Sequence, residues 1–132
     1  MPNQANIIVK KNDGTTDVVY TAVAASSGDK TPAVWRNNTV GTAPSHRPEL
    51  QVSSQSNGPR TARRLLVKGV YPTLVTGTDG KTNVADRFVL DATIVVPQGM
   101  PDADINEAAS QMLNLMASTL MKDQVKTGYA AT

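Results

Sequence analysis

The sequence lacks cysteine, has few aromatic residues and contains a single histidine. Without cysteine, the chain can have no disulfide, no thiolate nucleophile and no cysteine-based metal site. The one histidine, His46, lies beside prolines in a predicted loop, where we expect an ordinary surface residue. No histidine pair or carboxylate cluster has metal-ligand spacing, and no glycine-rich phosphate loop of the Walker type occurs. We therefore expect no enzyme, no metal, no cofactor and no small-molecule substrate.

Long apolar runs are also absent. No stretch approaches the roughly 18 residues that a membrane helix needs. The first residues, MPNQANIIVKK, include too short an apolar stretch for a secretory signal. We expect one soluble domain, made inside a cell, with no membrane partner. The 13 Lys and Arg residues only slightly exceed the 11 Asp and Glu residues, a net charge of +2, so nucleic-acid binding would depend on where the charges lie.

Residues 87–96, RFVLDATIVV, separate by parity into an apolar side and a mixed side. The apolar side has Phe88, Leu90, Ala92, Ile94 and Val96, and the mixed side has Arg87, Val89, Asp91, Thr93 and Val95. Because successive residues of a strand point to opposite faces, this pattern predicts a strand with one buried face. Residues 63–71, RRLLVKGVY, show a similar pattern with cations, and no acidic residue occurs between Arg60 and Thr78.

Shorter strand signals precede these two segments. Residues 7–10 and 18–23 flank Asp13-Gly14, a strong hairpin signal. Residues 33–39, with Trp35, and residues 49–53 are further candidate strands. The segment SNGPR at 56–60 predicts a turn, and residues 76–83, TGTDGKTN, predict a flexible polar loop.

After Pro101 the apolar period changes to that of a helix. Asp102 or Asp104 could cap it, and an apolar stripe follows at helical spacing: Ile105, Ala109, Met112, Met116 and Leu120. These patterns predict an α+β fold in which helices cover one face of an antiparallel sheet. We divide the chain into a hairpin (about 1–24), a sheet (33–97) and helices (102–127). Because one helical region can cover only part of a broad sheet, we also expect a partner subunit whose helices cover the rest.

The basic residues near residues 60–68 are the best functional candidates: Arg60, Arg63, Arg64 and Lys68. Cations that only keep a solvated strand edge from aggregating are an equally weighted alternative. If Leu65, Val67 and Tyr71 face the helices, the other face carries Arg64, Leu66, Lys68 and Val70, with Val89, Asp91, Gln51 and Ser53 beside them. Such a face could hold phosphates through its cations and base edges through its polar groups.

Taken in order, these segments resemble the coat proteins of the single-stranded RNA bacteriophages, the levivirus group. The resemblance spans the whole chain and is strongest at residues 54–73 and 87–104. It includes the NDGTTDV turn at 12–18, the VKGVYPT segment at 67–73, and the MASTLMKDQV segment at 116–125, which resembles the family's break between two helices. No single motif is diagnostic; the order of many weak signals carries the similarity.

The resemblance implies an N-terminal β-hairpin, a five-stranded antiparallel sheet and two C-terminal helices that interlock in a homodimer. Such dimers assemble into an icosahedral shell around genomic RNA, so it implies a virion protein made in the cytoplasm of a bacterial host. The family's open sheet face lines the shell interior and can bind an RNA stem-loop as a translational repressor. The loop between the last two strands would contact other dimers, through Thr76, Gly77, Thr78, Asp79, Gly80 and Lys81.

Carried over by position, Lys68 and Asp91 match RNA-contacting residues of the family. Gln51 and Ser53 match polar residues of the preceding strand. Val89 stands where the family commonly has a stacking tyrosine, and Leu66 and Glu49 replace small polar residues of its adenine pockets. The predicted RNA face thus comprises Lys68, Arg64, Asp91, Val89, Gln51, Ser53, Leu66 and Glu49. The alternative to a coat subunit is a free dimeric RNA-binding regulator that uses the same face.

Overall fold

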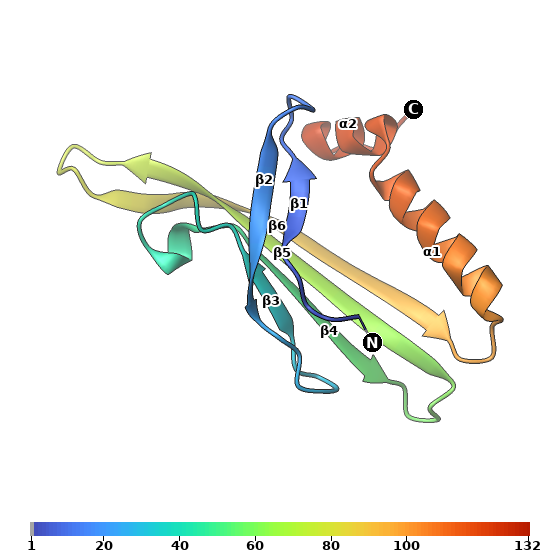
Figure 1. The fold of residues 1–132 in the computed structure, drawn as a ribbon. Helices are drawn as coiled ribbons and strands as arrows, with labels where there is room; N and C mark the ends of the chain where they lie inside the picture. Colours follow the sequence, from blue (N-terminus) through green and yellow to red (C-terminus); the bar gives the residue numbers. More distant parts are fainter. Residues whose placement is uncertain (1) are drawn as a thin grey trace.

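The structure, a computed structural model, describes residues 2–132. Six antiparallel strands form one sheet in chain order, and two helices follow (Figure 1). The strands are β1 (Ile7–Lys10), β2 (Asp17–Ala24), β3 (Ala33–Arg36), β4 (Glu49–Ser56), β5 (Ala62–Thr76) and β6 (Thr82–Pro97). The helices are α1 (Asp102–Met116) and α2 (Thr119–Thr127), with a short 3-10 helix, η1 (Pro44–His46), before β4. The predicted order of a hairpin, a sheet and two helices is confirmed.

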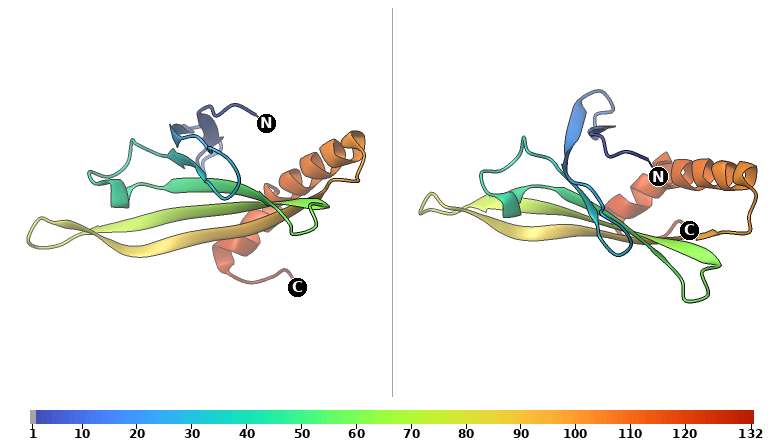
Figure 2. Two further views of the ribbon diagram at one scale, coloured as in Figure 1. Left: turned by 90° about the horizontal axis from the view of Figure 1, so that it is seen from below. Right: turned by 60° about the horizontal axis from the view of Figure 1, so that its bottom comes forward.

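The β1–β2 hairpin forms where Asp13-Gly14 predicted it. The Asp13 carboxylate accepts hydrogen bonds from the backbone N–H groups of Thr15 and Thr16, each at 2.9 Å, and from the Thr16 hydroxyl. Gly14 has a φ of 74°, which glycine adopts without strain. The pairing of β2 with β3 is irregular between Ala22 and Ala24, and the hairpin crosses one face of the sheet at a steep angle (Figure 2).

Strands β5 and β6 are much longer than their neighbours. β4 pairs with β5 only from Arg63 to Val70, whereas β5 continues to Thr76, paired with β6 alone. The predicted loop at 76–83 is therefore too long: Thr76 ends β5, Thr82 and Asn83 belong to β6, and the connection is residues 77–81. Polar Thr and Asn side chains carry no apolar period, although their backbone continues the ladder of hydrogen bonds.

The helix ends differ from the prediction at one site. Pro101 holds the N-cap position of α1 and no side chain caps it, so the predicted Asp cap is wrong. Asp102 and Asp104 lie in the first turn, where carboxylates still complement the helix dipole. The predicted break between the helices is confirmed, and the Ser118 hydroxyl accepts a hydrogen bond from the Met121 N–H to begin α2.

The helices do not cover the sheet of their own chain, so that prediction is wrong for a single subunit. After β6 the chain turns at residues 98–101, and α1 runs back past the β6 edge of the sheet without lying over either face (Figure 1). Within residues 2–132, the only element against which either helix packs substantially is the other helix. No described helix is long and apolar enough to cross a membrane.

As a consequence, the chain alone has no apolar core. Within residues 2–132 no large apolar side chain is fully buried. The accessible surface is 9733 Å², whereas a compact monomer of 14.0 kDa exposes about 6,700 Å². Two such chains together have an excess of about 6,000 Å², which is as large as the total surface that the larger obligate dimers bury.

Candidate nucleic-acid interface

The strands β4, β5 and β6 place the predicted RNA-face residues in rows across one side of the sheet. Directly opposed partners form the rows Glu49–Val70–Val89, Gln51–Lys68–Asp91, Ser53–Leu66–Thr93 and Gln55–Arg64–Val95. We call this side the charged face. All eight predicted residues lie on it: Lys68, Arg64, Asp91, Val89, Gln51, Ser53, Leu66 and Glu49. The structure thus brings the predicted residues together.

The side chains at the centre of the charged face are accessible. Lys68, Arg64 and Asp91 are exposed, and Val89 is 64% exposed. Lys68 lies between Gln51 and Asp91 in its row, and its ammonium group forms no ion pair with any described residue. The row therefore offers one unpaired cation flanked by two hydrogen-bonding side chains, an arrangement that suits a phosphate and a base edge.

Two arginines on this face were not among the predicted residues. Arg87 lies opposite Pro72 and two residues before Val89, which puts it on the charged face. Its parity within residues 87–96 was the signal that could have identified it. Arg36 lies opposite Glu49 and belongs to the same row as Val89. No sequence signal identifies Arg36, because its position depends on the register between β3 and β4.

Arg36 is held in place by Glu49. Its Nη2 and Nε atoms lie 2.9 and 3.3 Å from Glu49 Oε2, and Gln51 Nε2 donates to Glu49 Oε1 at 2.6 Å. Burial raises the pKa of the Glu49 carboxyl, but the hydrogen bonds from Gln51 and Arg36 and the Arg36 charge outweigh it, so the pKa lies below its usual value. Glu49 is thus ionised at neutral pH and neutralises Arg36.

The predicted basic group does not act as one cluster. Arg63 lies opposite Ser56 and Val96, on the other side of the sheet from Arg64. Its Nη2 donates to Asp29 at 2.6 Å, and this hydrogen bond lowers the pKa of the Asp29 carboxyl. Arg60 lies in the turn before β5 with a φ of 59°. Only Arg64 and Lys68 of the group therefore belong to the charged face.

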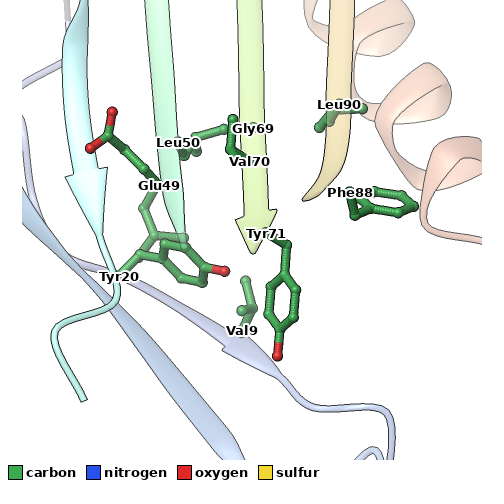
Figure 3. A pocket seen from close by; sticks show the side chains of 10 residues that line it. Val9, Tyr20, Glu49, Leu50, Gly69, Val70, Tyr71, Phe88 and Leu90 are labelled. Atoms are coloured by element: carbon green, nitrogen blue, oxygen red, sulfur yellow. The ribbon is translucent and has the colours of Figure 1, made fainter. Parts of the chain in front are cut away.

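The opposite side of the sheet, which we call the apolar face, carries the alternate positions of the same strands. Its apolar residues are Leu50, Val52, Leu65, Val67, Tyr71, Phe88, Leu90, Ala92, Ile94 and Val96. The hairpin reaches one end of this face and leaves a hollow of about 290 Å³, where Val9 and Tyr20 lie near Leu50 and Tyr71 (Figure 3). Tyr71 and Phe88 remain 55% and 53% exposed, and no apolar residue of this face is fully buried, so the apolar face is only partly covered.

The connection between β5 and β6 is an ordered turn at the far end of the long ribbon. Gly77 N–H donates to the Lys81 carbonyl at 2.8 Å, and Lys81 N–H donates to the Asp79 carboxylate at 3.0 Å. Gly80 has a φ of 78°. The turn protrudes well beyond the other strands (Figure 1), which leaves it accessible to another molecule.

No family model and no curated protein matches this sequence. Solved structures do match, over almost the whole chain. A virus-like particle of Beihai levi-like virus 21 matches with a TM-score of 0.82 and 17% identity, over 99% of each chain. A virus-like particle of bacteriophage NT-214 matches with a TM-score of 0.81 and 17% identity, over 99% of this chain and 100% of that one. The bacteriophage GA capsid protein matches with a TM-score of 0.77 and 17% identity, over 96% and 95%. The chain therefore has the coat-protein fold of the RNA bacteriophages.

Proposed function

We propose that this chain is the coat subunit of a single-stranded RNA bacteriophage, which dimerises, assembles into an icosahedral shell and packages genomic RNA inside it. Its location would be the virion, after synthesis in the cytoplasm of a bacterial host. The observation that carries the proposal is the pair of sheet faces, one apolar and only partly covered and the other cationic and open.

The apolar face and the helices support self-association. Within residues 2–132 the helices leave a set of large apolar side chains mostly exposed: Met112, Leu113, Leu115, Met116 and Leu120. A second copy could lay these residues over the apolar face and fill the hollow beside Tyr71 (Figure 3). Burying this surface would supply the hydrophobic stabilisation that one chain lacks.

The charged face supports RNA as the packaged partner. Its cations are Arg36, Arg64, Lys68 and Arg87, against the carboxylates Glu49 and Asp91. Once helices cover the apolar face, the charged face is the side of the sheet left open. It would then line the shell interior, where phosphate contacts hold RNA without regard to sequence.

Stem-loop binding by the same face, as a translational repressor, is the finer part of the proposal. Lys68, Asp91, Gln51 and Ser53 offer donors and acceptors for unpaired bases. Val89 offers no aromatic ring for stacking, which is a large part of affinity for unpaired bases. We therefore expect the protein to bind different stem-loops with affinities close to its affinity for other RNA.

Two observations support assembly into a shell: the protruding turn at residues 77–81 and the similarity to the solved structures named above. Those structures are described as virus-like particles, that is, assembled shells. A turn at the tip of a two-stranded ribbon can reach another dimer without disturbing the sheet. We propose that residues 76–81 form contacts between dimers.

Expression of the chain alone in bacteria, followed by nuclease treatment and sedimentation, tests the function. A coat subunit would sediment as large particles whose RNA survives the nuclease. A small dimer at every protein concentration would instead support the free RNA-binding regulator. Failure to bind RNA in either form would refute both functions.

A further inference from the structure

The row that begins at Arg36 differs electrostatically from the rest of the charged face. Arg36 and Glu49 are direct cross-strand partners, and their side chains are only 25% and 26% exposed. Both carboxylate oxygens of Glu49 are engaged, one by Arg36 and the other by Gln51. The carboxylate is thus fixed from two sides, and it cannot turn away without breaking both interactions.

The other cations of this face have no such counter-charge. Lys68, Arg64 and Arg87 form no ion pair with any residue in the described part of the chain. Each of them can therefore neutralise a phosphate. For Arg36 the same contact costs more free energy, because the half-buried Glu49 carboxylate would lose its ion-pair partner.

We infer that Glu49 is a specificity-determining residue of the charged face, which withholds Arg36 from RNA phosphates and so limits sequence-independent binding. This inference rests on the proposed RNA-binding function. With Arg36 neutralised, phosphate contact is confined to the lysine and arginines of β5 and β6, beside the hydrogen-bonding groups of Gln51 and Asp91. Glu49 thereby lowers the share of the RNA-binding free energy that comes from phosphate contacts and raises the share that comes from base contacts.

The test is the salt dependence of binding between the purified dimer and an unstructured single-stranded RNA of about 20 nucleotides. Each phosphate contact adds about 0.7 to the slope of log affinity against log salt concentration for single strands. For Glu49→Gln we expect the slope to steepen by about 0.7 and the affinity at 0.1 M salt to rise about fivefold. The matched control is Glu107→Gln, the same change at an exposed position of α1, which should leave the slope unchanged.

Removal of Arg36 separates this mechanism from a general charge effect. Arg36→Gln alone should leave the slope at its wild-type value, since Arg36 holds no phosphate there. In the double variant Arg36→Gln/Glu49→Gln the steeper slope of Glu49→Gln should disappear, and the slope should equal that of the wild type. If Glu49→Gln does not give a folded dimer by size-exclusion chromatography, the slope of Arg36→Gln alone still tests the inference.

Two results would overturn the inference while leaving the proposed function intact. One is a wild-type protein that binds RNA while Glu49→Gln has the same slope. The other is a shallower slope in Arg36→Gln, which would mean that Arg36 already binds phosphate. A wild-type dimer with no salt-dependent RNA binding would instead refute the proposed function itself.

Discussion

Lys68 and Asp91 lie directly opposite each other on β5 and β6, yet they form no ion pair. The ammonium group is therefore free to bind a phosphate, and the neighbouring carboxylate can accept hydrogen bonds from a base. Together with Arg64, two rows along β5, this pair is the centre of the proposed RNA surface.

Removing the two central cations should weaken RNA binding. In Lys68→Ala/Arg64→Ala two phosphate contacts are lost, so the salt slope for single-stranded RNA should fall by about 1.4. Both side chains are exposed, and the dimer should stay folded. The matched control is Lys122→Ala/Lys126→Ala on α2, which should bind as the wild type does. Unchanged affinity of the β5 variant at moderate salt would put the RNA surface elsewhere.

A charge on the apolar helix surface should prevent dimerisation. Met112 is 57% exposed in the single chain, and in the proposed dimer it lies against the partner. Met112→Asp would bury an unpaired carboxylate there, so we expect mostly unfolded or aggregated protein, measured by circular dichroism and size-exclusion chromatography. Asn114→Asp adds the same charge outside the apolar stripe and should leave the dimer intact. A folded, monomeric Met112→Asp protein would contradict the view that the fold needs two chains.

Shortening the turn between β5 and β6 should affect the shell more than the dimer. Thr76 and Thr82 are opposed residues, and a two-residue Asn-Gly turn can join them. Replacing residues 77–81 by Asn-Gly should thus preserve the dimer by size exclusion but give few or irregular particles by electron microscopy. Asp79→Ser, which changes one side chain of the turn, should assemble with only minor defects. Regular particles from the shortened variant would show that the turn makes no essential contact.

The hairpin turn predicts a pH-dependent contribution to stability. Hydrogen bonds from the Thr16 side chain and from the backbone of Thr16 and Thr15 lower the pKa of Asp13 from 3.8 to about 2. Because the folded-state pKa is lowered, the stabilisation is present above about pH 4 and is lost as the pH falls through 2. Asp13→Ala should therefore have a lower urea midpoint than the wild type at pH 7, and the two midpoints should converge near pH 2. A difference that stays constant from pH 7 to pH 2 would exclude this linkage.

The alternation of side chains was enough to predict the faces of the sheet. Parity within residues 87–96 and 63–71 placed Lys68 with Val89 and Asp91, and the register confirmed it. The same rule assigns Arg63 to the apolar side, although its nearness to Arg64 in the sequence suggested one basic cluster. Charge clustering along a strand is thus a weaker guide than parity.

Other features depend on contacts that no local pattern contains. The ion pair between Arg36 and Glu49 follows from the register of β3 and β4, set by a loop of twelve residues. No local pattern shows that the helices do not pack on their own sheet. An apolar stripe has the same sequence whether it packs on its own chain or on a partner. The length of the β5–β6 ribbon was missed since its polar residues have no apolar period.

A cryo-electron microscopy map of particles purified from bacteria tests the central claim most directly, namely that the two sheet faces have opposite roles. The predicted result is a shell in which Lys68 and Asp91 face an RNA-filled interior, while the helices of a second subunit lie over Tyr71 and Phe88. A shell with the charged face on its outer surface, or with the apolar face uncovered, would contradict the account.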